Sequence, residues 1–173
     1  MSITMGVVRT GVVAALAATA LAGPQAVAAD APRVALAKNA DAQTKAFVKA
    51  FPRAAMASGT ACGADYKLTT AIPLPKGTDP KMRLATLFTY TKGGNQVGCA
   101  ILDNNMGSKS YKLKVQACDS WGKNCQTDEG NFLNYAGPVR TTDPVCGVLT
   151  ATMWSSAGYE LFNYKTQSGW LCD

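Results

Sequence analysis

The spacing of hydrophobic positions changes well before the middle of the chain. In the first part Phe47, Val48 and Phe51 fall on one face of a helix. Asn39 or Asp41 precedes this face by the right distance to cap the first turn, because short oxygen-bearing side chains accept the unpaired N–H groups of a helix start. This pattern predicts a short N-terminal helix.

The whole of this first part, residues 29–61, is rich in alanine and contains no cysteine. A residue that precedes a proline disfavours helical backbone angles, so Pro52 predicts that the helix ends near Phe51. Residues 55–61, with the sequence AMASGTA, are predicted to be a linker. For residues 29–61 as a whole, a processed propeptide or a flexible tether is the alternative interpretation.

From residue 62 onward, short runs rich in Val, Ile, Thr, Tyr and Phe alternate with turn residues. The KGGN sequence at 92–95 is a strong hairpin signal, and 103–107 form a second turn. Consecutive strands joined by tight turns form an antiparallel meander. Residues 62–173 are therefore predicted to be a mostly β domain, either a small antiparallel β-sandwich or an open barrel. The predicted strands are Tyr66–Leu74, Arg83–Thr91, Val97–Asp103, Ser110–Ala117, Cys146–Met153 and Tyr159–Tyr164.

Residues 1–28 have the pattern of a secretory signal peptide. Arg9 is the only ionised side chain among them, an apolar run covers 11–23, and the small residues AVA at 26–28 suit a signal peptidase. The apolar run is shorter than the roughly 20 residues that span a bilayer. We therefore expect an exported, extracellular protein with no transmembrane segment.

Six cysteines lie after this signal, and an even number in an exported chain predicts three disulfides. A zinc site is not supported, because the chain has no histidine and no C-x-x-C pair. The favoured pairs are Cys62–Cys99, Cys118–Cys125 and Cys146–Cys172. The second pair flanks a turn sequence and should cross-link a hairpin tip. Among the pairings left for the other four cysteines, the favoured ones tie the start of the domain to its third strand and the C-terminal tail to a core strand.

The formal net charge is +6, and the basic residues are dispersed along the chain. Lys109, Lys112 and Lys114 form the densest group and resemble the polar face of a strand. A basic exported protein favours anionic surfaces such as cell-wall polymers. No basic stripe with interleaved aromatic residues is present, so nucleic acid is not an expected partner.

Catalytic chemistry has little support in this sequence. Without histidine, Ser–His and Cys–His nucleophile systems cannot be built. Asp128 and Glu129 are adjacent and would point to opposite faces of a strand. No phosphate-binding, dinucleotide or calcium motif occurs. We predict no catalytic residue, no metal and no cofactor.

The aromatic residues are the remaining candidates for a contact surface. Trp121 lies on the predicted hairpin tip, where an exposed indole can stack on a sugar or anchor a protein contact. Trp121, with Tyr135 second, is the predicted binding surface. Trp154 is predicted to be a core residue, and Trp170 to cover the disulfide of Cys172.

Several segments carry a family resemblance. They are CGADY at 62–66, GGN at 93–95 before Cys99, and DEGNFLNYAGPV at 128–139. Over residues 62–172 the chain resembles the spore-associated protein A family of filamentous actinobacteria. The resemblance implies a small exported protein found with spores and aerial growth, without enzymatic activity. Taken on its own residues, the block 130–139 is predicted to be a packed loop that crosses the sheet.

Three functions follow from these observations. The first is a non-enzymatic protein associated with a polymer of the spore surface or cell wall. The second is a secreted effector, either a small toxin or a protease inhibitor that uses Lys123 in the Cys118–Cys125 loop. The third is a glycan hydrolase with a carboxylate pair. We rank them in that order.

Overall fold

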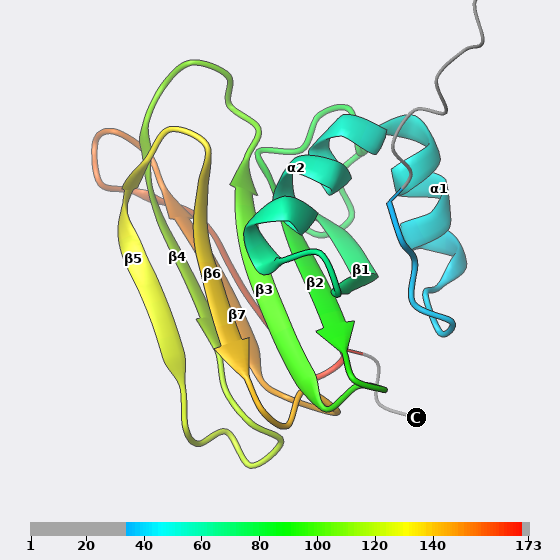
Figure 1. Ribbon diagram of the computed structural model, residues 1–173. Coiled ribbons are helices and arrows are strands. Elements are labelled where there is room, and N and C mark those ends of the chain that lie inside the picture. Colours follow the sequence, from blue (N-terminus) through cyan, green and yellow to red (C-terminus); the bar gives the residue numbers. More distant parts are fainter. Residues whose placement is uncertain (1–33, 171–173) are drawn as a thin grey trace, which may run out of the picture. The chain divides into compact units, whose positions relative to one another are not determined.

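The computed structural model describes residues 34–170 (Figure 1). The predicted signal peptide, residues 1–28, lies outside the described residues, and so does Cys172. No helix among the described residues is long and apolar enough to cross a membrane.

Two short helices precede the strands. Helix α1 (Ala42–Ala50) begins after Asp41, whose carboxylate accepts the N–H of Thr44 at 2.6 Å, as an N-cap should. It ends before Phe51, so the predicted end is confirmed. Helix α2 (Pro52–Cys62) then begins with its proline in the first turn, where no N–H is needed.

The predicted linker over 55–61 is wrong, because these residues form most of α2. Alanine and methionine are strong helix formers, and Ala55 is fully buried against the sheet. The helix passes close to Tyr90 at Gly59, where a β-carbon would lie in van der Waals contact, 3.4 Å from the Tyr90 ring. Tertiary packing therefore offsets the weak helix propensity of this glycine.

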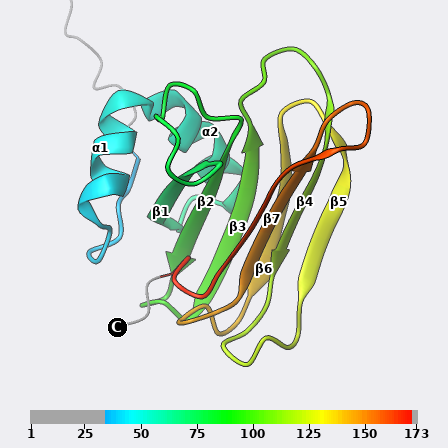
Figure 2. The same ribbon diagram turned by 180° about the vertical axis from the view of Figure 1, so that it is seen from behind.

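Eight strands form two four-stranded antiparallel sheets (Figures 1 and 2). Sheet 1 consists, in spatial order, of β1 (Lys67–Leu74), β2 (Ala85–Lys92), β3 (Val97–Asn104) and β6 (Tyr135–Thr141). Sheet 2 consists, in spatial order, of β5 (Gln126–Phe132), β4 (Tyr111–Ala117), β7 (Leu149–Trp154) and β8 (Glu160–Thr166). The predicted mostly β, antiparallel fold is confirmed.

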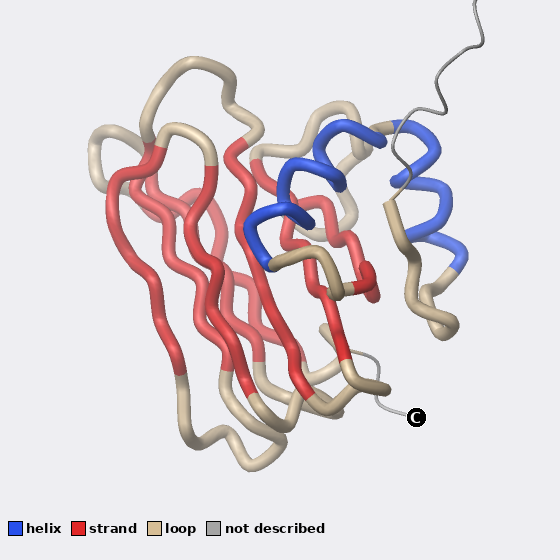
Figure 3. Tube along the Cα trace, viewed as in Figure 1, coloured by secondary structure: helices blue, strands red, loops and turns tan. Residues whose placement is uncertain are grey.

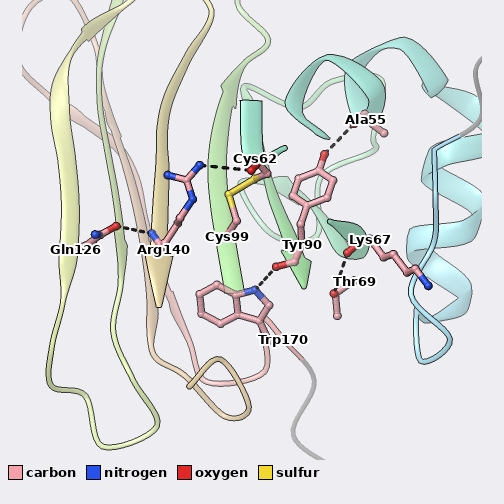
Figure 4. Close-up of a disulfide and its surroundings, with 9 residues drawn as sticks. All are labelled: Ala55, Cys62, Lys67, Thr69, Tyr90, Cys99, Gln126, Arg140 and Trp170. Carbon is pink, nitrogen blue, oxygen red and sulfur yellow. Dashed lines mark hydrogen bonds between the residues drawn. A yellow bond between two sulfur atoms is a disulfide. The ribbon is translucent and has the colours of Figure 1, made fainter. Parts of the chain in front are cut away.

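The main hydrophobic core lies between the two sheets. Leu87 and Leu102 from sheet 1 pack in the same cluster as Leu113 and Met153 from sheet 2, and all four are fully buried. Trp170 is also fully buried in this cluster, and its indole N–H donates to the carbonyl of Tyr90 at 3.2 Å (Figure 4). Trp170 is therefore a core residue.

A second hydrophobic cluster lies between the helices and sheet 1. Phe47 of α1 meets Phe88 of β2 edge to face, with ring centroids 5.7 Å apart. Ala55 of α2 and Ile101 of β3 are fully buried in the same cluster. One face of sheet 1 is consequently covered by sheet 2 and the other by the helices, which are drawn in blue in Figure 3.

The block 130–139, predicted to be a loop, instead consists of the end of β5, a two-residue connection and most of β6. The two strands belong to different sheets, so the chain crosses from one layer to the other between them. The carboxylate of Asp128 accepts the N–H of Gly137 at 2.6 Å, and the side-chain oxygen of Gln126 accepts the N–H of Arg140 at 2.6 Å. Side chains thus satisfy the outer edge of β6, and the two sheets do not close into a barrel.

Two of the three predicted disulfides are present among the described residues. Cys62–Cys99 joins the end of α2 to β3, with Cα atoms 6.0 Å apart (Figure 4). Cys118–Cys125 closes the β4–β5 loop, with Cα atoms 4.0 Å apart. Cys146 is also disulfide-bonded, and Cys172, its predicted partner, lies outside the described residues.

Candidate binding surface

The β4–β5 loop presents Trp121 to solvent. Its side chain is 84% exposed, on a loop closed by the Cys118–Cys125 disulfide. Exposed tryptophan at a loop tip buries little surface within its own chain, so it contributes little to folding. The predicted hairpin-tip position of Trp121 is confirmed.

Asp119 organises this loop from within. One carboxylate oxygen accepts the N–H groups of Trp121 at 3.0 Å and Lys123 at 2.7 Å, while the other accepts the side-chain amide of Asn124 at 2.8 Å. These hydrogen bonds, with that from Lys123 the largest contribution, lower the pKa of Asp119. The carboxylate is therefore ionised at neutral pH and holds the loop in one conformation.

The same loop is attached to its neighbour, the β6–β7 loop. The hydroxyl of Ser120 donates to the carboxylate of Asp143 at 2.6 Å. The N–H of Val148 donates to the carbonyl of Asp119 at 3.4 Å. The loop that holds Trp121 is thus fixed by the Cys118–Cys125 disulfide and by these two hydrogen bonds. Binding through Trp121 would therefore require little further ordering of the backbone.

Tyr135, the second predicted contact residue, lies elsewhere. It is the first residue of β6 and is partly buried against the helix-side cluster. Trp121 and Tyr135 flank the seven-residue strand β5 on opposite sides in the sequence. At about 3.3 Å per residue this strand separates them by about 23 Å. The structure does not bring these two residues into one site.

The outer face of sheet 2 is uncovered by either helix (Figures 1 and 2). The outward positions of its strands alternate with the buried ones and are mostly threonine, lysine, asparagine and glutamine. They are Lys112, Lys114, Gln116, Thr127, Glu129, Asn131, Thr150, Thr152, Trp154, Asn163 and Lys165. These positions are mostly polar and rich in hydrogen-bonding groups, although Thr152 is only 2% exposed and the exposed Leu161 of β8 is apolar.

Trp154 is the single large aromatic residue among these outward positions, so the prediction that it is a core residue is wrong. It is partly exposed at the end of β7, directly opposite Lys112 on β4. Leu149, Ala151 and Met153 face the core, and strand alternation sends the next residue outward. That alternation was the signal in the sequence that identifies Trp154 as a surface residue.

A shallow cavity of about 310 Å³ lies beside Trp154. Besides the indole, Tyr111 and Lys112 line this cavity together with short polar residues and glycine, namely Ser110, Asn131, Ser155, Ser156 and Gly158. An aromatic face bordered by hydroxyl and amide groups is chemically suited to a sugar ring, which has apolar faces and polar edges.

The charges of this face are paired. The Lys112 ammonium lies 4.8 Å from the centroid of the Trp154 ring and 2.9 Å from a carboxylate oxygen of Glu129. Lys114 lies 3.8 Å from the other oxygen of the same carboxylate. The hydrogen bond from Lys112 is the largest of the effects that lower the pKa of Glu129. The carboxylate of Glu129 thus offsets part of the positive charge of Lys112 and Lys114 beside Trp154.

The described residues therefore define a disulfide-bonded antiparallel β-sandwich with one helix-covered and one open sheet. Comparison with protein-family models, with curated proteins and with solved structures finds no match. Within residues 34–170 no three His, Cys, Asp or Glu side chains are grouped so that they could hold a metal ion.

Proposed function

We propose that this chain is a secreted, non-enzymatic protein that binds a polysaccharide of the spore surface or cell wall. The observation that carries the proposal is the open face of sheet 2, where Trp154 lies among hydrogen-bonding side chains beside a shallow cavity. The resemblance to the spore-associated protein A family supports the surface setting. The disulfides support an oxidising, extracellular location.

Trp121 supplies a second contact for the same role. Trp154 is paired with Lys112 near the beginning of β4, and Trp121 follows the end of that strand. The two tryptophans therefore lie near opposite ends of β4. A long polymer can engage both, and two linked contacts bind more tightly than either one alone.

The protease-inhibitor alternative receives less support from the loop that was expected to carry it. The N–H of Lys123 donates to Asp119, and its carbonyl accepts the N–H of Asp119 at 2.9 Å. Both backbone groups are therefore occupied within the loop. An inhibitor that pairs its extended main chain with a protease needs such groups free.

Sedimentation with spores, stripped cell walls and insoluble polysaccharides tests this function on purified, oxidised protein. Stacking and apolar contacts largely persist in high salt, whereas exposed charge contacts weaken. We expect salt-resistant binding that falls at least tenfold in Trp154→Ala and less in Trp121→Ala. Met82→Ala is the matched control, since Met82 is 71% exposed but lies on the β1–β2 loop. Binding that is absent, or that a salt wash removes completely, would contradict the proposal.

A further inference from the structure

Three lysines from three separate segments surround one cavity at the end of sheet 1. The cavity has a volume of about 350 Å³, which is within the range of about 300–1,000 Å³ typical of ligand pockets. Lys38, Lys67 and Lys92 line it together with a single acidic residue, Asp65. Figure 4 shows the Lys67 side chain extending away from the Cys62–Cys99 disulfide.

The backbone fixes the first of these lysines next to the sheet. The N–H of Ala37 donates to the carbonyl of Leu68 at 2.8 Å, and the N–H of Leu68 donates to the carbonyl of Ala35 at 2.8 Å. This short segment thereby pairs with the beginning of β1 in a parallel bridge. Lys38 directly follows Ala37, so this pairing places Lys38 beside the cavity.

The strand pairing of sheet 1 places the other two lysines at the same end of the sheet. Lys67 on β1 lies opposite Thr91 on β2, and Lys92 is the next residue of β2, so strand alternation directs the two side chains to opposite faces of the sheet end that borders the cavity. The Lys92 ammonium lies 4.9 Å from the centroid of the Tyr66 ring, an attractive position for a cation. Lys67 is therefore positioned by β1, and Lys92 is positioned by β2 and by its contact with Tyr66.

Among the described residues, ion pairs form between Glu129 and Lys112 or Lys114, and none involves the three lysines of the cavity. Ammonium groups gathered around one cavity without a partner create a positive potential that attracts anions. With Asp65 as the only acid in the lining, the cavity has an excess of positive charge.

The remaining wall is short and open. Gly93 and Gly94 in the β2–β3 turn have φ angles of 62° and 67°, which favour glycine, and a β-carbon on Gly94 would contact nothing within 4 Å. The amide side chains of Asn39 and Asn95 also line the cavity and can donate hydrogen bonds. A ligand can thus reach the ammonium groups without displacing a bulky side chain.

We propose that this cavity binds phosphate groups, in particular those of a phosphodiester polymer. A phosphate offers several charged oxygens to ammonium and amide donors at once. This inference depends on the proposed function in one respect, namely that the protein is located at a cell surface. Its chemistry is separate from that of Trp154, because it recognises charge and not a sugar face.

Isothermal titration at low ionic strength, with pyrophosphate and poly(glycerol phosphate) as probes, tests the site. The pocket variant is Lys67→Gln with Lys92→Gln, and the control is Lys45→Gln with Lys81→Gln, which removes the same charge from exposed positions elsewhere. We expect the pocket variant to bind both probes at least tenfold more weakly and the control less than twofold more weakly. Equal weakening in both variants would reduce binding to net charge and overturn the proposal, as would the absence of binding to the unaltered protein.

Two further measurements identify the source of the phosphate and distinguish failure of this inference from failure of the proposed function. Tighter binding of the polymer than of pyrophosphate at equal phosphate concentration supports a polymer ligand, whereas equal binding overturns that part of the proposal. Sedimentation with a neutral polysaccharide is measured on the same variants. If pyrophosphate binding depends on Lys67 and Lys92 while no polysaccharide sediments the protein, the phosphate site stands and the function proposed for Trp154 fails.

Discussion

The outer faces of the two sheets differ more than any other pair of regions in this molecule. The face of sheet 1 is covered by α1 and α2, contains fully buried residues such as Phe88 and Ile101, and includes the Cys62–Cys99 disulfide. The face of sheet 2 is polar, has no helix over it, and presents Trp154 beside paired charges. Both sheets nevertheless contribute to the same core between them.

This difference separates the two roles that the proposed function requires, a stable fold and a binding surface. Covering sheet 1 adds a second hydrophobic cluster, and the burial of apolar surface is the main source of stability. The outer face of sheet 2 buries less apolar surface because no helix covers it. In the proposed function this face is the surface that binds the ligand. Changes on the covered face should therefore affect unfolding, and changes on the open face should affect binding.

Removing the Cys62–Cys99 disulfide should have the largest effect. The bond spans 37 residues, and in the chain-entropy model a loop of this length contributes about 4 kcal/mol. Cys62→Ala with Cys99→Ala should lower the free energy of unfolding by that amount in urea titrations. Cys118→Ala with Cys125→Ala, which opens a separation of only 7 residues, should cost about 2 kcal/mol. Equal losses in the two variants would contradict the larger contribution assigned to the longer Cys62–Cys99 loop.

Truncating Phe47 should have the next largest effect. Its ring is 3% exposed and packs against Phe51 and Phe88, so Phe47→Ala leaves a cavity between α1 and sheet 1. We expect a loss of about 3 kcal/mol in the free energy of unfolding. Asn131→Ala, on the exposed face of sheet 2, should change it by less than about 0.5 kcal/mol. A similar loss in both variants would contradict the division of roles.

The sequence predicted three of the four strands of each sheet and missed one edge strand in each. All of β1, β2 and β3 were predicted within two residues, because their β-branched and aromatic runs are bounded by clear turns. β5 and β6 were missed because Gly130, Gly137 and Pro138 lower the strand signal. Both strands lie at sheet edges, where a proline without an N–H is tolerated.

The candidate sites depended on information that a linear pattern does not contain. Trp121 was recognised because the two cysteines around it define a local loop. The lysine cavity was not, since Lys38, Lys67 and Lys92 are dispersed in the sequence and meet only through the pairing of β1 with β2 and with the preceding segment. The densest lysines in the sequence, by contrast, include two that share an ion pair with the single carboxylate of Glu129.

Asp103 on β3 should make stability depend on pH. Burial, partly offset by a hydrogen bond from Asn105 and by the charge of Arg83, raises the pKa of Asp103 to about 6. The folded protein thus holds this proton more tightly than the unfolded chain, where the pKa is about 3.9. The free energy of unfolding should consequently fall by about 2 to 3 kcal/mol as the pH rises from about 4 to about 6.

Asp103→Asn isolates this contribution from that of other carboxylates. The asparagine oxygen can still accept the hydrogen bond that Asn105 now donates at 2.8 Å, but the side chain cannot ionise. Relative to the unaltered protein, the variant should gain stability between pH 4 and pH 7 in urea titrations. A difference between the two proteins that is constant across this range would show that the buried carboxyl does not titrate as expected.

Trp154→Ala should have the smallest effect on unfolding and thereby sharpens the comparison most. The indole is partly exposed and loses mainly its contact with the Lys112 ammonium, so the cost should be less than about 1 kcal/mol. Polysaccharide sedimentation should nevertheless fall at least tenfold, because the sugar face loses its stacking partner. Measuring both quantities on one preparation distinguishes the alternatives. A large loss of stability would mean that the outer face of sheet 2 helps to hold the fold together, and unchanged binding would remove Trp154 from the proposed surface.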